Sequence, residues 1–73
     1  MKKFEFEWEL PRVLGYIPTP PGYSTKEPTI PVYNTGELKV WSTGSSPSEG
    51  RADLARRGYK GAEWATLLYQ RLL

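Results

Sequence analysis

Prolines are concentrated in one segment of this chain, and they limit what that segment can form. Six of the seven prolines lie between residues 11 and 31: Pro11, Pro18, Pro20, Pro21, Pro28 and Pro31. Proline fixes φ and lacks a backbone donor, so no regular element is expected to run through these residues. A loop of about 20 residues is uncommon in a small domain and is usually a binding segment or disordered. The sequence therefore predicts a long irregular arm over residues 11–31.

The amino-acid composition excludes several kinds of chemistry. The chain contains no cysteine and no histidine, so a disulfide, a thiolate ligand and a Ser-His or Cys-His nucleophile pair are all excluded. The commonest general base and zinc ligand is missing as well. We therefore expect no catalytic activity, no metal site and no cofactor. A length of 73 residues predicts one small domain over residues 1–73.

Charge and hydropathy indicate a cytoplasmic protein that makes no contact with a membrane. No apolar run approaches the roughly 20 residues of a membrane span. Glu5, Glu7 and Glu9 interrupt the segment that would be apolar in a signal peptide. The net charge is +2, and the basic excess lies in residues 41–73. Such an excess is compatible with a nucleic acid or an acidic protein surface, and equally with a solvated helix face.

Residues 1–10 have the pattern of a strand with one buried face. Large apolar side chains alternate with lysine or glutamate, and this period of two is typical of a half-buried strand. Pro11 ends the strand. The side chains expected in the core are Phe4, Phe6, Trp8 and Leu10.

The three glutamates of that strand, Glu5, Glu7 and Glu9, share its opposite face. Carboxylate pairs can act as acid and base, but the acid needs an apolar pocket that raises its pKa, and a wet sheet face solvates all three alike. The favoured interpretation is a solvated face, paired across strands with Lys39. An acidic stripe that meets a basic partner is the alternative.

A β-hairpin is expected over residues 30–41. Residues 30–33 and 37–41 read as two strands, and Gly36 can take the positive φ that closes the turn between them. Pro31 places the first of these strands at a sheet edge. Two strands alone are marginal in water, so we expect the strand of residues 1–10 to complete a three-stranded antiparallel sheet.

Residues 47–73 are predicted to be helical. Ser46, Pro47 and Glu49 match a capping box that starts a helix, and Gly58 can cap its end. A second helix follows Gly61, because four apolar side chains recur at helical spacing. Those side chains are Trp64, Leu67, Leu68 and Leu72. The predicted fold class is α+β: a small three-stranded antiparallel sheet with a C-terminal helical hairpin and a long Pro-rich loop.

Two groups of residues are candidates for binding a partner. Tyr16, Ile17 and Tyr23 lie on the Pro-rich arm, and exposed tyrosines on a loop bury much area for little loss of rotamer entropy. The second group lies at the turn between the predicted helices, where basic and aromatic side chains suit a negative surface of protein or RNA. Its members are Arg56, Arg57, Tyr59 and Lys60.

A helix-turn-helix over residues 51–71 is an alternative interpretation, and it would make the chain a small nucleic-acid-binding protein. The usual pattern places glycine where this chain has Tyr59, and Gly58 comes one residue early. The second helix would carry only Lys60 and Arg71 as basic residues, and phosphate contacts need more positive charge. A plain helical hairpin is therefore favoured over a DNA reader.

The chain as a whole resembles small regulators of bacterial RNA polymerase that are encoded by lytic phages of Xanthomonas. The resemblance rests on the 73-residue length, the absence of cysteine and histidine, and the overall character of the sequence. No short motif carries it, so it assigns no individual residues.

The resemblance implies transcription control without catalysis. Such regulators bind the β and β′ subunits of RNA polymerase near the RNA exit channel, displace the primary sigma factor, and act as antiterminators with NusA as a co-factor. We expect a monomer that works in the cytoplasm of an infected bacterial host, with direct nucleic-acid contact in a secondary role.

Overall fold

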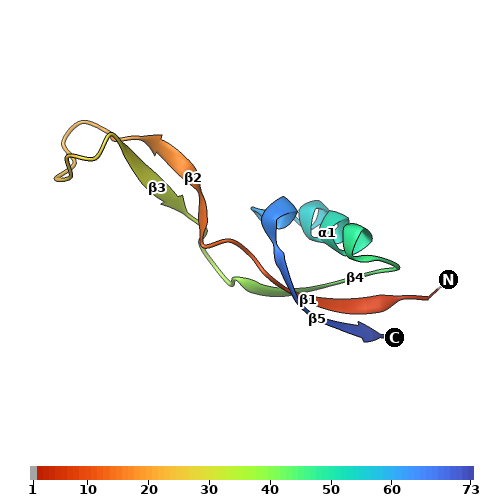
Figure 1. Ribbon diagram of the computed structural model, residues 1–73. Helices are drawn as coiled ribbons and strands as arrows, with labels where there is room; N and C mark the ends of the chain where they lie inside the picture. Colours follow the sequence, from red (N-terminus) through yellow and green to blue (C-terminus); the bar gives the residue numbers. More distant parts are fainter. Residues whose placement is uncertain (1) are drawn as a thin grey trace.

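The computed structural model describes residues 2–73, and this part of the chain forms two antiparallel sheets, one α-helix and one short 3-10 helix. In chain order the elements are β1 (Phe4–Glu9), β2 (Val13–Pro18), β3 (Thr29–Tyr33), β4 (Lys39–Gly44), α1 (Pro47–Arg56), η1 (Ala62–Trp64) and β5 (Thr66–Leu72). Figure 1 shows a body made of β1, β4, β5 and α1, from which β2 and β3 project as a two-stranded ribbon.

The sheet of the body has the strand order β4-β1-β5, so β1 is its central strand. Both neighbours run antiparallel to β1. The alternation predicted for β1 is confirmed, since Phe6 and Trp8 are fully buried. A register shift lies between Glu7 and Trp8 on the β5 side, where Tyr69 and Leu67 are the respective partners.

The hydrophobic core lies between this sheet and α1 (Figure 1). The indole Nε1 of Trp8 donates a hydrogen bond of 2.7 Å to Oγ of the buried Ser42. The guanidinium of Arg51 on α1 lies 5.0 Å from the centre of the Trp8 ring system, within cation–π range. The buried apolar side chains are Phe6, Trp8, Leu10, Val40, Leu54, Ala62 and Ala65.

The predicted start of α1 is confirmed. Ser46 is the N-cap and its side chain accepts from the backbone N–H of Glu49 at 3.3 Å, with Pro47 in the first turn. The Glu49 carboxylate accepts from the backbone N–H of Ser45 at 2.9 Å, one residue earlier than a standard capping box. Gly58 has φ +89°, as expected of a left-handed residue after a helix.

The ribbon of β2 and β3 makes the molecule long and narrow. The principal extents are 54 × 17 × 16 Å. At the base of the ribbon, Nδ2 of Asn34 donates to the carbonyls of Pro11 and Lys60, each at 3.1 Å. The backbone N–H of Asn34 also donates to the Arg12 carbonyl at 2.8 Å. The side-chain bond to Lys60 connects the ribbon to the segment after α1.

The predicted C-terminal helical hairpin is wrong, and the fold is mostly sheet rather than the expected α+β arrangement. Gly61 takes φ +81° and Ala65 is extended, so η1 ends after a single turn. The residues that remain are too few for a stable isolated helix. As β5 they pair instead with the open edge of β1, and this pairing satisfies the backbone groups of a strand whose other edge already pairs with β4.

The predicted hairpin over residues 30–41 is also wrong. β3 pairs with β2 in the ribbon, whereas β4 pairs with β1 in the body. Gly36 does take a positive φ of +91°, but the turn sends the chain from one sheet to the other. The prediction that residues 11–31 form an irregular arm is therefore also wrong for β2 and for the start of β3, which contain Pro18 and Pro31. A two-stranded ribbon has an unpaired outer edge on each strand, and prolines are tolerated on such edges.

The structure contains no helix within residues 2–73 that is long and apolar enough to span a membrane.

Candidate protein-binding surfaces

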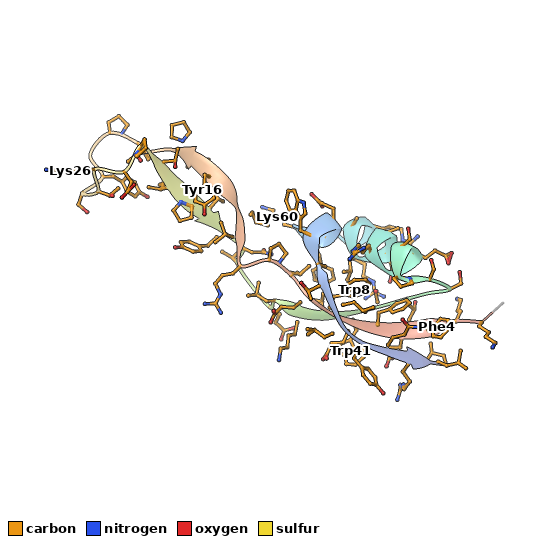
Figure 2. The ribbon with its side chains drawn as sticks, viewed as in Figure 1. Phe4, Trp8, Tyr16, Lys26, Trp41 and Lys60 are labelled. Atoms are coloured by element: carbon orange, nitrogen blue, oxygen red, sulfur yellow. The ribbon has the colours of Figure 1, made fainter. Side chains whose placement is uncertain are left out.

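The arm residues predicted to bind a partner lie on the projecting ribbon. Tyr16 and Ile17 belong to β2, and Tyr23 follows in the loop between β2 and β3. Their exposed fractions are 69%, 43% and 57% respectively. Figure 2 shows Tyr16 on the ribbon, well away from the core around Trp8. We call these three residues the ribbon surface.

The two faces of the ribbon differ in character. Tyr16 lies opposite Pro31, whereas Ile17 lies opposite Ile30. Side chains of successive strand residues point to opposite faces, so one face carries tyrosine and proline and the other carries aliphatic side chains. Neither face is covered by a second layer of structure (Figure 1). A strand pair this small is marginal alone in water, so its uncovered faces suit contact with another molecule.

The loop at the far end of the ribbon is stabilised by hydrogen bonds to its own backbone carbonyls. The N–H of Thr19 donates to the Pro28 carbonyl at 3.2 Å, and the Thr19 hydroxyl donates to the Glu27 carbonyl. The N–H of Tyr23 donates to the Pro20 carbonyl at 3.4 Å in a turn that contains Gly22 at φ +91°. These bonds order the loop before any partner arrives, which lowers the entropy cost of binding.

The second predicted group lies at the end of α1, and two of its positive charges are already paired within the chain. Arg56 and Arg57 both pair with Asp53, at 2.6 and 3.1 Å. Burial would raise the pKa of the Asp53 carboxyl, but hydrogen bonds from Arg56 and from the Thr43 backbone, together with the charges of Arg57 and Arg56, bring it below its usual value. The carboxylate thus stays charged and neutralises part of the basic turn.

Tyr59 and Lys60 continue this turn towards the base of the ribbon. Both are exposed, and both line an open hollow of about 250 Å³ together with residues of the turn between β3 and β4. Figure 2 shows Lys60 on the body, whereas Tyr16 lies on the ribbon. The structure therefore places the two predicted groups on separate surfaces and does not bring them together.

A third surface was missed by the sequence analysis. It is the face of the body sheet opposite α1, where Glu7 lies directly between Trp41 on β4 and Tyr69 on β5. The exposed fractions of Trp41 and Tyr69 are 44% and 51%. In Figure 2, Trp41 points away from the side of the sheet that carries Trp8 and α1. Alternation in the segment 37–41 could have indicated the direction of Trp41, but Tyr69 was assigned to a helix.

A further hollow of about 440 Å³ lies beside the start of α1, lined in part by Lys3, Glu49 and Arg56. The hydroxyl of Ser45 and its backbone N–H both donate to the Glu49 carboxylate and lower its pKa below the usual value. The acid here serves to cap the helix. Within residues 2–73 no group of three or more potential metal-ligating side chains comes together.

The arrangement needed for a helix-turn-helix is missing from the part of the chain that the structure describes. The segment that would form the recognition helix is η1 followed by β5. A strand at the edge of a three-stranded sheet cannot present its residues to a major groove as that motif does.

Comparison with protein-family models, with curated proteins and with solved structures found no match to this chain.

Proposed function

We propose that this chain is a non-catalytic regulator of transcription that binds bacterial RNA polymerase. It contacts the β and β′ subunits near the RNA exit channel, inhibits sigma-dependent initiation and promotes antitermination together with NusA. The choice of polymerase follows the resemblance in length and composition to phage-encoded regulators. Binding without chemistry is the mode of action that the exposed surfaces described above support.

The observation that supports this proposal is the projecting ribbon. It carries Tyr16, Ile17 and Tyr23 in exposed positions, and no other element within residues 2–73 covers it (Figure 1). Large aromatic side chains dominate the energetics of many protein interfaces because they bury a large area with few rotatable bonds. A binding surface of this kind acts stoichiometrically, by occupying its partner.

The length of the molecule supports contact with two subunits at once. One principal extent is 54 Å and the other two are 17 and 16 Å. The ribbon surface lies at one end, and the exposed sheet face around Trp41 lies on the body (Figure 2). Two separated contacts made by one small molecule raise the overall affinity, because the second contact forms at a high effective concentration.

The proposal is tested by capturing proteins from bacterial lysate with the full chain. We expect RNA polymerase at a stoichiometric amount, and we expect the purified chain to reduce transcription from a sigma-dependent promoter. The double substitution Tyr16→Ala with Tyr23→Ala should lose both effects. Trp64→Ala is the control, since Trp64 on η1 is also an exposed aromatic residue, at 62%, but lies away from the ribbon and from the sheet face around Trp41.

Two results would contradict the proposal. One is the absence of polymerase from the captured proteins while the chain is folded. The other is direct binding to bare duplex DNA with a steep loss of affinity as salt rises, which is the behaviour of a nucleic-acid-binding protein.

A further inference from the structure

The outer face of the body sheet carries three acidic residues in one line, and only the middle one has no basic residue directly opposite it. Glu5 lies opposite Arg71 and pairs with it at 2.9 Å. Glu9 lies opposite Lys39. Glu7, between them, faces an aromatic residue on each side.

Glu7 has no ion-pair partner in the part of the chain that the structure describes. It is half-buried, and its neighbours across the two strand pairs are Trp41 and Tyr69. Residues directly opposite in antiparallel strands have Cβ atoms about 4.5–5.5 Å apart. A carboxylate is therefore flanked at short range by two exposed aromatic side chains on the same face.

We propose that Trp41, Glu7 and Tyr69 form a receptor for an arginine side chain of a protein partner. The guanidinium of arginine is planar, stays charged, makes paired hydrogen bonds to a carboxylate and stacks on aromatic rings. The three side chains supply the carboxylate and two rings side by side. Charge complementarity therefore favours an arginine as the occupant of this face.

The same chain already uses this type of contact inside its fold. The guanidinium of Arg51 lies 5.0 Å from the ring centre of Trp8 on the opposite face of the sheet. On the outer face the aromatic side chain and the acid are present, and the guanidinium is the group that a partner would supply. An arginine placed there would also cover parts of Trp41 and Tyr69 that now face solvent.

This inference deepens the proposed function, because it rests on the chain acting on a protein partner and names the chemistry of a second contact. It is tested separately from polymerase binding. The probe is a short peptide that contains two arginines among glycines and serines, and the control peptide has citrulline, which is neutral and of nearly the same shape, at both positions. Binding to the full chain is followed by NMR, through the indole N–H signals of the tryptophans and the backbone amide signals of Glu7 and Tyr69.

We expect the arginine peptide to shift the Trp41 indole signal and the citrulline peptide to leave it in place. Glu7→Gln should weaken binding of the arginine peptide about tenfold, because a charge-assisted hydrogen bond is lost. Trp41→Leu should weaken it several-fold, by roughly the contribution of one cation–π contact. Glu37→Gln is the control, since it removes the same charge from an exposed residue elsewhere.

Several results would overturn the inference. These are equal binding of the citrulline peptide, equal effects of Glu7→Gln and Glu37→Gln, or equal binding of a peptide with lysine in place of arginine. A concentration-dependent dimer that Glu7→Gln abolishes would instead make a second copy of the chain the occupant. Any of these outcomes with polymerase capture intact removes this receptor alone, whereas loss of capture with arginine binding intact removes only the proposed function.

Discussion

Trp8 is a central residue of the hydrophobic core. It is fully buried on the central strand, its ring centre lies 5.9 Å from that of Phe6, and its indole N–H bonds to Ser42 on the neighbouring strand. Arg51 reaches it from α1. A single side chain therefore links β1, β4 and the helix.

Replacement of Trp8 by alanine should unfold the chain. The substitution leaves a large cavity and an unpaired Ser42 hydroxyl, and a core Trp→Ala change costs about 3–5 kcal/mol, which is comparable to the total stability of so small a domain. Urea denaturation followed by circular dichroism measures the effect. Trp41→Ala is the control, since that side chain is exposed and should change stability by less than about 1 kcal/mol. A folded Trp8→Ala protein would show that the core is wrongly assigned.

Asp53 is the other residue with a large structural role, because its buried carboxylate joins three partners. It accepts from Arg56 at 2.6 Å and from the Thr43 backbone N–H at 3.3 Å, and it pairs with Arg57 at 3.1 Å. These contacts favour the charged form and lower the pKa of Asp53 in the folded state. The carboxylate therefore connects the end of α1 to β4.

Asp53→Asn should destabilise the protein at pH 7, by about 1–3 kcal/mol. Because the folded-state pKa of Asp53 is lowered, its contribution is fully present above the unfolded pKa of about 4 and is lost as pH falls through the folded pKa. The difference in unfolding free energy between wild type and variant should shrink accordingly in acid. Urea titrations at pH 7 and below pH 4 measure this. An equal difference at both values would contradict the assigned role.

Among the helices and strands, the sequence correctly predicts the elements whose local signals agree with their packing. The alternation around Phe6 and Trp8 correctly predicts β1, and the capping residues Ser46 and Pro47 correctly predict the start of α1. Both signals are local, since each depends on residues within a few positions of one another. Tertiary contacts only reinforce them.

The elements that were predicted wrongly are those whose structure depends on distant partners. The spacing of leucines in β5 suits a helix, but the open edge of β1, more than 55 residues earlier in the chain, decides its conformation. The strand β2 carries no pattern that reveals its pairing with β3 across the proline-rich loop. The exposure of Tyr16 could be predicted, because it follows from a position on the Pro-rich arm. The alignment of Tyr69 with Glu7 could not be predicted, because it depends on the pairing of β5 with β1.

The contact between α1 and the sheet provides a test at this scale. A Cβ atom added at Gly50 would lie 2.7 Å from Cδ2 of the buried Phe6 and 3.1 Å from Oγ of Ser42. Gly50→Ala should therefore lose about 1–3 kcal/mol through overpacking, although alanine is a better helix former by about 1 kcal/mol. Thermal unfolding measures the net effect.

Ser48→Ala on the exposed part of α1 is the matched control for Gly50→Ala. It introduces the same residue into the same helix without a contact to the sheet, and it should be neutral or slightly stabilising. A stabilised Gly50→Ala protein would mean that the helix lies farther from the sheet than described.

The whole molecule is elongated because its two sheets do not stack. The prediction of a single compact sheet placed β3 beside β4, whereas the chain uses β3 to extend the ribbon away from the body (Figure 1). The Cα radius of gyration is 15.8 Å. A compact domain of this length would have a radius of about 11 Å, and an unfolded chain about 26 Å.

Small-angle X-ray scattering of the free chain distinguishes these shapes. We expect a radius of gyration near the Cα value of 15.8 Å and a distance distribution with a long tail, since the ribbon projects in one direction. A radius near about 11 Å would show that the ribbon folds back onto the body, and one near about 26 Å would show an unfolded chain.

The most direct test of the account is the affinity of purified bacterial RNA polymerase for the chain, measured by calorimetric titration. We expect one molecule bound per polymerase, and we expect the double substitution Tyr16→Ala with Tyr23→Ala to weaken binding at least tenfold, about the loss of one strong interface residue. Trp64→Ala, which removes an exposed aromatic side chain outside the ribbon, should bind like the wild type. Failure of the folded wild-type chain to bind polymerase, or undiminished binding by the double variant, would contradict the central claim that the ribbon is the surface through which this protein acts.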